Sequence, residues 1–201
     1  MVKYRGPRLR IVRRLGELPG LTRKIVPNHK SYPPGQHGKN SKKPSDYLIR
    51  LKEKQKLRYN YGVSEHQLYR YVQTARKSKG ATGSVIIQLL EMRLDTILFR
   101  SGFAATIPAA RQMVSHSHIE VNGRKVNIAS FLCKKNDKIE VRSKAKSYIN
   151  EIVKTVSNTD IPNYLKVDKN NLIIQVSDIA NSQESCIKIN ELLVVEYYSQ
   201  R

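Results

Sequence analysis

Basic side chains are the most frequent residues in this sequence that could take part in chemistry. The 201 residues include 37 Lys and Arg against 16 Asp and Glu, which gives a formal net charge of +21. A charge of this size destabilises a compact fold by self-repulsion and is typical of proteins that bind a polyanion. The excess is uneven, because residues 1–80 hold 21 Lys and Arg against 4 Asp and Glu. The chemistry indicated is contact with phosphates, concentrated in the N-terminal part of the chain.

The other chemically capable residues form no recognisable catalytic or metal-binding pattern. His116 and His118 are two positions apart with no Cys or carboxylate cluster near them in sequence, so we interpret them as turn residues. Cys133 and Cys186 are far apart and neither belongs to a CxxC motif, which argues against a disulfide or a zinc site. No paired carboxylates or nucleophile–base pair stands out. We therefore expect no enzyme activity, no metal, no cofactor and no small-molecule substrate.

A tight β-hairpin is predicted in the segment "SHSHIEVNGRKV", residues 115–126. The Asn-Gly step at 122–123 suits the positive φ angles that two-residue hairpin turns require, and alternating apolar and charged residues flank it. Across such a turn Glu120 faces Lys125. The tip then presents Arg124 and Lys125, which raises the question of what the tip contacts.

Two short helices joined by Gly62 are predicted between residues 45 and 80. Ser45 can cap a helix that begins at "DYLIRLKEKQ", and Ser64 with Gln67 forms the capping box of the next helix. The first helix is apolar on one side near its start, but its second half is charged nearly all round. That pattern favours a helix covered by an anion over a helix that packs on a core.

The N-terminal segment, residues 1–44, is predicted to be an extended basic arm. Gly and Pro are so frequent there that no helix longer than "RLRIVRRLGEL" fits, yet its apolar residues indicate that it orders against another part of the structure. The opening "MVKYRGPRLR" lacks the apolar core of a signal peptide and the amphipathic run of a transit peptide. No apolar stretch approaches the roughly 18 to 20 residues that span a bilayer, so we expect no membrane association.

The rest of the sequence alternates helices and strands. An apolar helix is predicted from Thr82 or Ser84 to Gly102, and Thr106 is expected to cap a further helix with Pro108 in its first turn. The elements expected after the hairpin are a turn at 136–137 with a further strand, a helix over 144–155, strands near 165–167 and 172–176, and the apolar segment "ELLVVEYYS".

The segment "RLDTILFRSGFAATIPAARQMVSHSHIEVNGRKVN" resembles the S4 RNA-binding module, in which a helix and a hairpin form a basic surface for structured RNA. The flanking segments "YRGPRLRIVRRLGELPGLT", "PPGQHG", "SDYLIRLKEKQKLRYNYGVSE" and "ELLVVEYYS" are similar to the S4 family of small-subunit ribosomal proteins, in its plastid and cyanobacterial branch. Many bacterial members carry a cysteine-bearing metal knuckle in the N-terminal segment. That segment has no cysteine in this sequence, as in the plastid and cyanobacterial branch, so the resemblance implies no metal site for this chain.

The resemblance implies an α+β fold with an inserted domain. Residues 45–91 would form a helical domain closed by a C-terminal helix at 187–201, and residues 92–186 would form an inserted α/β domain with the module at about 92–141. Family members bind the 5′ domain of 16S-type ribosomal RNA early in assembly. They lie near the mRNA entry path, contact small-subunit proteins five and twelve, and affect decoding accuracy.

Folded RNA is recognised through its shape, phosphates and 2′-hydroxyls, which calls for Lys and Arg on rigid elements. The candidate RNA contacts are Arg5, Arg8, Arg10, Arg13, Arg14, Arg50, Lys54, Arg58, Arg70, Lys77, Arg93, Arg100, Arg111, Arg124 and Lys125.

Two other functions use the same module. An RNA-modifying enzyme is one, because "RLD" at 93–95 echoes the aspartate motif of pseudouridine synthases, but the sixty residues after the module are too few for a catalytic domain. A free-standing assembly or quality-control factor is the other. The Lys, Asn and Ile richness of residues 166–190 suits an AT-rich organellar genome, so we expect a plastid ribosome, with the bacterial cytoplasm as the alternative.

Overall fold

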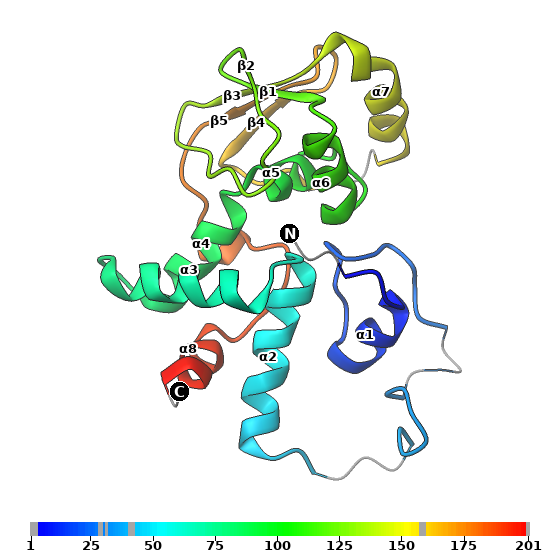
Figure 1. The fold of residues 1–201 in the computed structure, drawn as a ribbon, viewed down its shortest axis with the longest axis vertical. Coiled ribbons are helices and arrows are strands. Elements are labelled where there is room, and N and C mark those ends of the chain that lie inside the picture. The colour runs from blue at the N-terminus through cyan, green and yellow to red at the C-terminus, as the bar shows by residue number, and fades with distance from the viewer. Residues whose placement is uncertain (1–3, 28–29, 31, 40–42, 157–159, 200–201) are drawn as a thin grey trace. The chain divides into compact units, whose positions relative to one another are not determined.

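A computed structural model describes residues 4–27, 30, 32–39, 43–156 and 160–199 (Figure 1). The remaining parts of the predicted arm and of the predicted C-terminal helix, residues 1–3, 28–29, 31, 40–42 and 200–201, lie outside the described residues. The contacts divide the chain into two compact units. Unit 1 is formed by Met1–Ile86 together with Cys186–Arg201, and unit 2 is Ile87–Ser185. Within the described residues, no helix is long and apolar enough to cross a lipid bilayer.

Unit 1 is helical. Its helices are α1 (Arg8–Leu15), α2 (Asp46–Asn60), α3 (Glu65–Lys77), the first part of α4 (Thr82–Glu91) and α8 (Glu191–Ser199). The predicted N-caps are confirmed, because Ser45 Oγ accepts the Leu48 N–H at 3.3 Å and Ser64 Oγ accepts the Gln67 N–H at 3.2 Å. Each bond satisfies a backbone donor that the first helical turn leaves unpaired.

The N-terminal arm is partly helical and takes part in the core of unit 1. Val12 and Leu15 of α1 are buried, as are Leu18 and Leu21 after it. The N–H of Gly20 donates to the fully buried Oδ1 of Asn60 at 2.9 Å, which ties the arm to the end of α2. The arm therefore orders against the helical unit, and its one helix, α1, lies within the segment "RLRIVRRLGEL" that the sequence left open to a helix.

Helix α2 is covered by protein along its second half. Lys54 is only 3% exposed; its Nζ is 2.8 Å from Oε1 of Glu65 and 4.6 Å from the ring centre of Tyr197. The Tyr198 hydroxyl donates to the same Glu65 oxygen at 2.9 Å. Burial raises the pKa of Glu65, but the hydrogen bonds from Lys54 and Tyr198 outweigh it, so the pKa lies below its usual value. Helix α8 packs on α2. Protein, and not an anion, covers the face of α2 that carries Lys54, Leu57 and Asn60, and the buried ammonium of Lys54 has little surface to offer an RNA.

Helices α4 and α8 approach closely where each begins. The Ser84 hydroxyl donates to Oε2 of Glu191 at 3.0 Å. A Cβ atom placed on Gly83 would lie 2.6 Å from the Cβ of Glu191. Only a residue without a side chain fits this contact.

Unit 2 is built on a five-stranded antiparallel sheet with the strand order β2-β1-β3-β5-β4. Its strands are β1 (Ile119–Val121), β2 (Arg124–Lys125), β3 (Lys138–Val141), β4 (Leu165–Asp168) and β5 (Ile173–Val176). Its helices are α5 (Leu94–Arg100), α6 (Ile107–Ser115) and α7 (Lys146–Thr155), with short 3-10 turns at Ser143–Ala145 and Ser182–Glu184 (Figure 1). The predicted strands, and the helix predicted over residues 144–155, are confirmed to within two residues.

One hydrophobic core lies between the sheet and the helices of unit 2. Alternate residues of the strands point into it, such as Ile119 and Val121 of β1 and Ile174 of β5. Helices α5 and α6 pack against each other and supply residues such as Leu98 and Val114. This alternation leaves mainly polar residues on the other face of the sheet, with Ile173 of β5 as an apolar exception, as expected for an antiparallel sheet with one side in solvent.

The helix predicted from residue 82 to residue 102 is interrupted at Arg93. Its backbone is extended, with φ −74° and ψ 142°, and it pairs with Leu132 in an antiparallel bridge. The N–H of Cys133 donates to the Met92 carbonyl at 2.9 Å. Pairing with this distant loop overrides the local helix preference, and α4 and α5 are separate helices.

Candidate RNA interface

The predicted hairpin is confirmed. Glu120 pairs with Lys125 across β1 and β2, and the turn has φ 51° at Asn122 and φ 73° at Gly123. Arg124 and Lys125 are exposed at its tip. Both side chains are therefore available to a partner that approaches this end of the sheet.

Three further lysines lie beside the hairpin, and they were not among the sequence-based candidates. Lys134 and Lys135 belong to the turn that leads into β3, Lys138 is the first residue of β3, and all three are exposed. Because Val121 pairs with Ile139, this turn and the hairpin lie at the same end of the sheet. The spacing of the two predicted turns around antiparallel strands is the signal that could have found these residues.

Arg93, Asp95 and Arg111 form a buried charge cluster between α5 and α6. Arg93 donates through Nε and Nη2 to the two oxygens of Asp95, at 3.0 and 2.8 Å. Arg111 Nε donates to Asp95 Oδ2 at 2.7 Å. The side chains of Arg93 and Asp95 have no exposed surface, and that of Arg111 is 14% exposed. The enclosed guanidinium of Arg93 has no exposed surface to offer an RNA, whereas the partly exposed Arg111 remains a candidate contact.

Arg100 is half-buried at the end of α5. Its Nη2 donates to the Glu184 carbonyl at 2.6 Å, and its Nε is 3.8 Å from the buried carboxylate of Glu91. The Tyr164 hydroxyl donates to the same carboxylate at 3.1 Å. Burial and the charge of Glu91 raise the pKa of Tyr164 far above its usual value, so the phenol keeps its proton. These contacts fix the Arg100 side chain within unit 2.

The candidate residues of unit 1 differ in exposure. Exposed residues are Arg5, Arg10 and Arg14 of the arm and Arg70 and Lys77 of α3, whereas Arg8, Arg13, Arg50 and Arg58 are half-buried. Tyr69, next to Arg70 on α3, is 41% exposed. An exposed aromatic ring beside basic residues can stack on an unpaired base, and sequence reasoning had not singled out this tyrosine.

The half-buried arginines of unit 1 contact other groups of the same unit. Arg13 Nη2 donates to the Tyr32 carbonyl at 2.9 Å, and its guanidinium lies 5.1 Å from the Tyr32 ring centre. Arg8 Nη1 donates to the Leu21 carbonyl at 3.3 Å. Two further contacts are Arg50 Nε with Glu196 Oε2 at 2.8 Å and the Arg58 guanidinium at 5.2 Å from the Tyr59 ring centre. These residues shape the surface on which the exposed arginines lie.

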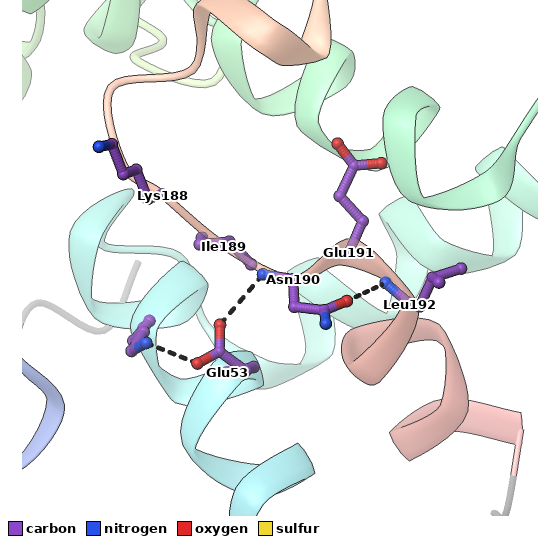
Figure 2. Close-up of a pocket in the computed structure, with 7 residues that line it drawn as sticks. Glu53, Lys188, Ile189, Asn190, Glu191 and Leu192 are labelled. Atoms are coloured by element: carbon purple, nitrogen blue, oxygen red, sulfur yellow. Dashed lines mark hydrogen bonds and ion pairs between the residues drawn. The ribbon is translucent and has the colours of Figure 1, made fainter.

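A shallow hollow in unit 1 lies between α2 and the start of α8. It is lined by Glu53, Lys56 and residues 188–192. Figure 2 shows the Glu53 carboxylate turned to the backbone N–H of Asn190, which donates to it at 3.3 Å. Lys56 pairs with the other oxygen of Glu53. The described residues that line the hollow include no nucleophile with an adjacent base.

Neither Cys133 nor Cys186 forms a disulfide within the described residues. Burial, followed by the charges of Asp137 and Asp95, raises the pKa of Cys133 to about 12, so this thiol is not a nucleophile at neutral pH. Cys186 Sγ accepts from Asn60 Nδ2 at 3.1 Å. Among the described residues, no three His, Cys, Asp or Glu side chains are grouped as metal ligands would be.

Two family models match the chain over adjacent segments. The Ribosomal protein S4/S9 N-terminal domain matches residues 3–91, and the S4 domain matches residues 92–139. Among similar proteins, "Small ribosomal subunit protein uS4" of Trichodesmium erythraeum is 56% identical over 205 residues, and that of Microcystis aeruginosa is 54% identical over 203 residues. "Small ribosomal subunit protein uS4c" of Pyropia yezoensis is 49% identical over 203 residues. Each alignment covers 100% of both chains.

Proposed function

Because the chain belongs to the small ribosomal subunit protein uS4 family, we propose that it is a structural component of the small ribosomal subunit. In this role it binds the 5′ domain of 16S-type ribosomal RNA early in assembly and contributes to translational accuracy. The observation that carries the proposal is the similarity over the whole length of relatives that bear this name. The net charge of +21 supports a partner with many phosphates.

The exposed basic residues divide into two groups that act differently on RNA. Arg5, Arg10 and Arg14 lie in or next to the short helix α1, and their contacts are mainly with phosphates along the RNA backbone. Arg70 and Lys77 on α3, and Arg124 with Lys125 on the hairpin, lie on regular elements that hold them in fixed register. Fixed donors favour one RNA shape over another, whereas many loosely spaced charges favour any RNA.

Binding measurements at several salt concentrations test this division. Alanine at the exposed Arg5, Arg10 and Arg14 should reduce the log–log salt slope by roughly 0.7 to 0.9 for each lost phosphate contact, and should weaken binding to a 5′-domain transcript and to a plain duplex about equally. Alanine at Arg124 and Lys125 should change the slope less and reduce the preference for the transcript. The reverse pattern would overturn the division.

The proposal extends to the molecular neighbours and the compartment. We infer contacts with small-subunit proteins five and twelve near the mRNA entry path, and a plastid ribosome as the location, with the bacterial cytoplasm as the alternative. The organellar name of the Pyropia yezoensis relative and the Lys-, Asn- and Ile-rich composition of residues 166–190 support the plastid. Chemical cross-linking on intact small subunits from isolated plastids would test both inferences. Cross-links to other proteins instead would overturn the first.

The rival functions are an RNA-modifying enzyme and a free-standing assembly factor. Asp95, the aspartate an enzyme would need, is enclosed by two arginines and has no exposed surface, which speaks against catalysis. Sedimentation in high salt separates the remaining possibilities. A structural component stays with small subunits in stoichiometric amount, whereas a release into the supernatant would favour an assembly factor and overturn the proposal.

A further inference from the structure

Two neighbouring turns at one end of the unit 2 sheet carry five exposed basic residues. We name this set the basic edge: Arg124 and Lys125 in the hairpin, with Lys134 and Lys135 in the turn before β3 and Lys138 at the start of β3. Such a concentration of positive charge favours an anionic partner. The question is whether the two turns act separately or as one surface.

Asp137 joins the two turns. Its Oδ1 accepts from Nδ2 of Asn122 at 2.9 Å, and its Oδ2 accepts from the backbone N–H of Lys134 at 2.7 Å. Asn122 completes the connection, because its Oδ1 accepts from the N–H of Lys138 at 2.9 Å and its own N–H donates to the Lys138 carbonyl at 2.8 Å. One carboxylate and one amide therefore cross-link both turns.

The position of Asp137 is unfavourable on charge alone. A carboxylate amid basic residues repels phosphate and reduces the pull of the edge on an RNA. The two hydrogen bonds that its carboxylate accepts, one from each turn, explain its presence, because they fix the two turns relative to each other. Holding several donors in one arrangement before binding lowers the ordering cost that binding would otherwise carry.

We propose that the basic edge is a single preassembled phosphate-binding surface for ribosomal RNA, and that Asp137 is the positioning residue that holds it together. The proposal rests on the proposed function and adds Lys134, Lys135 and Lys138 to the interface. Among the described residues, Arg124, Lys125 and Lys134 have no carboxylate within ion-pair distance. Lys135 and Lys138 pair with Asp178 and Glu140 at exposed sites, and each is 54% exposed. Exposed pairs are weak, so phosphates can replace these carboxylates.

The test compares three variants of the full-length protein. Asp137→Asn removes a negative charge and replaces one of the two acceptors by a donor. Asn122→Gly removes the same link without changing any charge, and glycine accepts the positive φ of 51° at that position. Asp178→Asn is the matched control, because it removes an equal charge next to Lys135 but does not join the two turns. Binding is measured to a 5′-domain transcript and to a plain duplex over a range of salt concentrations.

If Asp137 acts by positioning, Asp137→Asn should weaken binding to the transcript about five- to tenfold although the protein has become more positive. Asn122→Gly should do the same, and both should lower the log–log salt slope by roughly 0.7 or more although no basic residue is lost. The Asp178→Asn control should bind as tightly as the wild type or about twofold tighter. Melting temperatures measured in parallel show that each variant is folded, and loss of stability alone would not move the salt slope.

Other results overturn specific claims. If the wild type binds the transcript no better than the duplex, the proposed function fails. If the wild type discriminates but Asp137→Asn behaves like Asp178→Asn, the positioning role fails alone. Should Asp137→Asn not fold, Asn122→Gly and the pair Lys134→Ala/Lys138→Ala decide, because unchanged transcript binding by both would show that the edge contacts no RNA.

Discussion

Replacing Asp95 of α5 with asparagine should destabilise the protein far more than removing a partly exposed carboxylate from the sheet of the same unit. Asp95 is the shared anion of two guanidinium groups: Arg93 bonds to both of its oxygens and Arg111 to one of them. The backbone N–H of Thr96 also donates to it at 3.0 Å. Without the carboxylate, the enclosed charge of Arg93 has lost its counter-ion.

The size of the effect follows from burial. Breaking a buried ion pair by removing one partner costs about 3 to 5 kcal/mol, because the other charge is left uncompensated. Asparagine keeps one acceptor, and the partly exposed Arg111 can turn toward water, so we expect the lower end, about 3 kcal/mol. For a chain of this length, 1 kcal/mol shifts the melting temperature by about 2 to 4 °C, which gives a decrease of about 6 to 12 °C.

The assay is thermal unfolding followed by circular dichroism, with Glu120→Gln as the control. Glu120 forms an ion pair with Arg142 at 3.0 Å in which the side chains are 30% and 36% exposed. Such pairs contribute about 0 to 1 kcal/mol, although the charge removed is the same. If Asp95→Asn melts within about 2 °C of Glu120→Gln, the buried cluster does not stabilise the fold as argued here. Arg93 would then regain its place as a candidate RNA contact.

Three further changes have expected outcomes. Glu65→Gln should remove a pH-dependent contribution to stability. Because the pKa of Glu65 is lowered in the folded protein, its ionised carboxylate stabilises the fold at pH values above about 4.5, and this stabilisation is lost as the pH falls through the lowered pKa. The free energy of urea unfolding should therefore depend less on pH in the variant than in the wild type over that acidic range. Gly83→Val should cost at least about 1 to 3 kcal/mol in the same assay, because even its Cβ would lie 2.6 Å from the Cβ of Glu191, and an unchanged midpoint would contradict the close approach. Gly123→Val should weaken RNA binding without a change of charge, because a β-branched residue is strained at φ +73°; equal affinity of the folded variant would show that the turn is not needed.

Local signals in the sequence predicted the parts of the fold that depend on nearby residues. Ser45, Ser64 and Thr106 cap their helices as expected, since a cap involves only the next three residues. The hairpin was equally predictable, because the positive φ at its turn selects Asn and Gly. The strands of the sheet followed from alternating apolar residues.

Features that depend on distant partners were not predictable in this way. The break at Arg93 arises from a bridge to Leu132, about forty residues later, against a local preference for helix. The sequence pattern placed Lys54 on a charged surface, but in the structure its ammonium contacts Glu65 and the ring of Tyr197 and is buried. A sequence pattern does not tell whether a long basic side chain is solvated or buried. Only the structure therefore separates the buried Lys54 and Arg93 from the exposed candidates.

The division of the chain into units has a consequence for the order of events during synthesis. Unit 2 is continuous in sequence, so all of it is available for folding once residue 185 has left the ribosome that makes it. Unit 1 begins at the first residue but needs Cys186–Arg201, and the buried Tyr197 and Tyr198 of α8 are among the last to be added. Domains usually fold in the order in which they are made. Here the part of the chain that emerges first is the part whose fold is completed last.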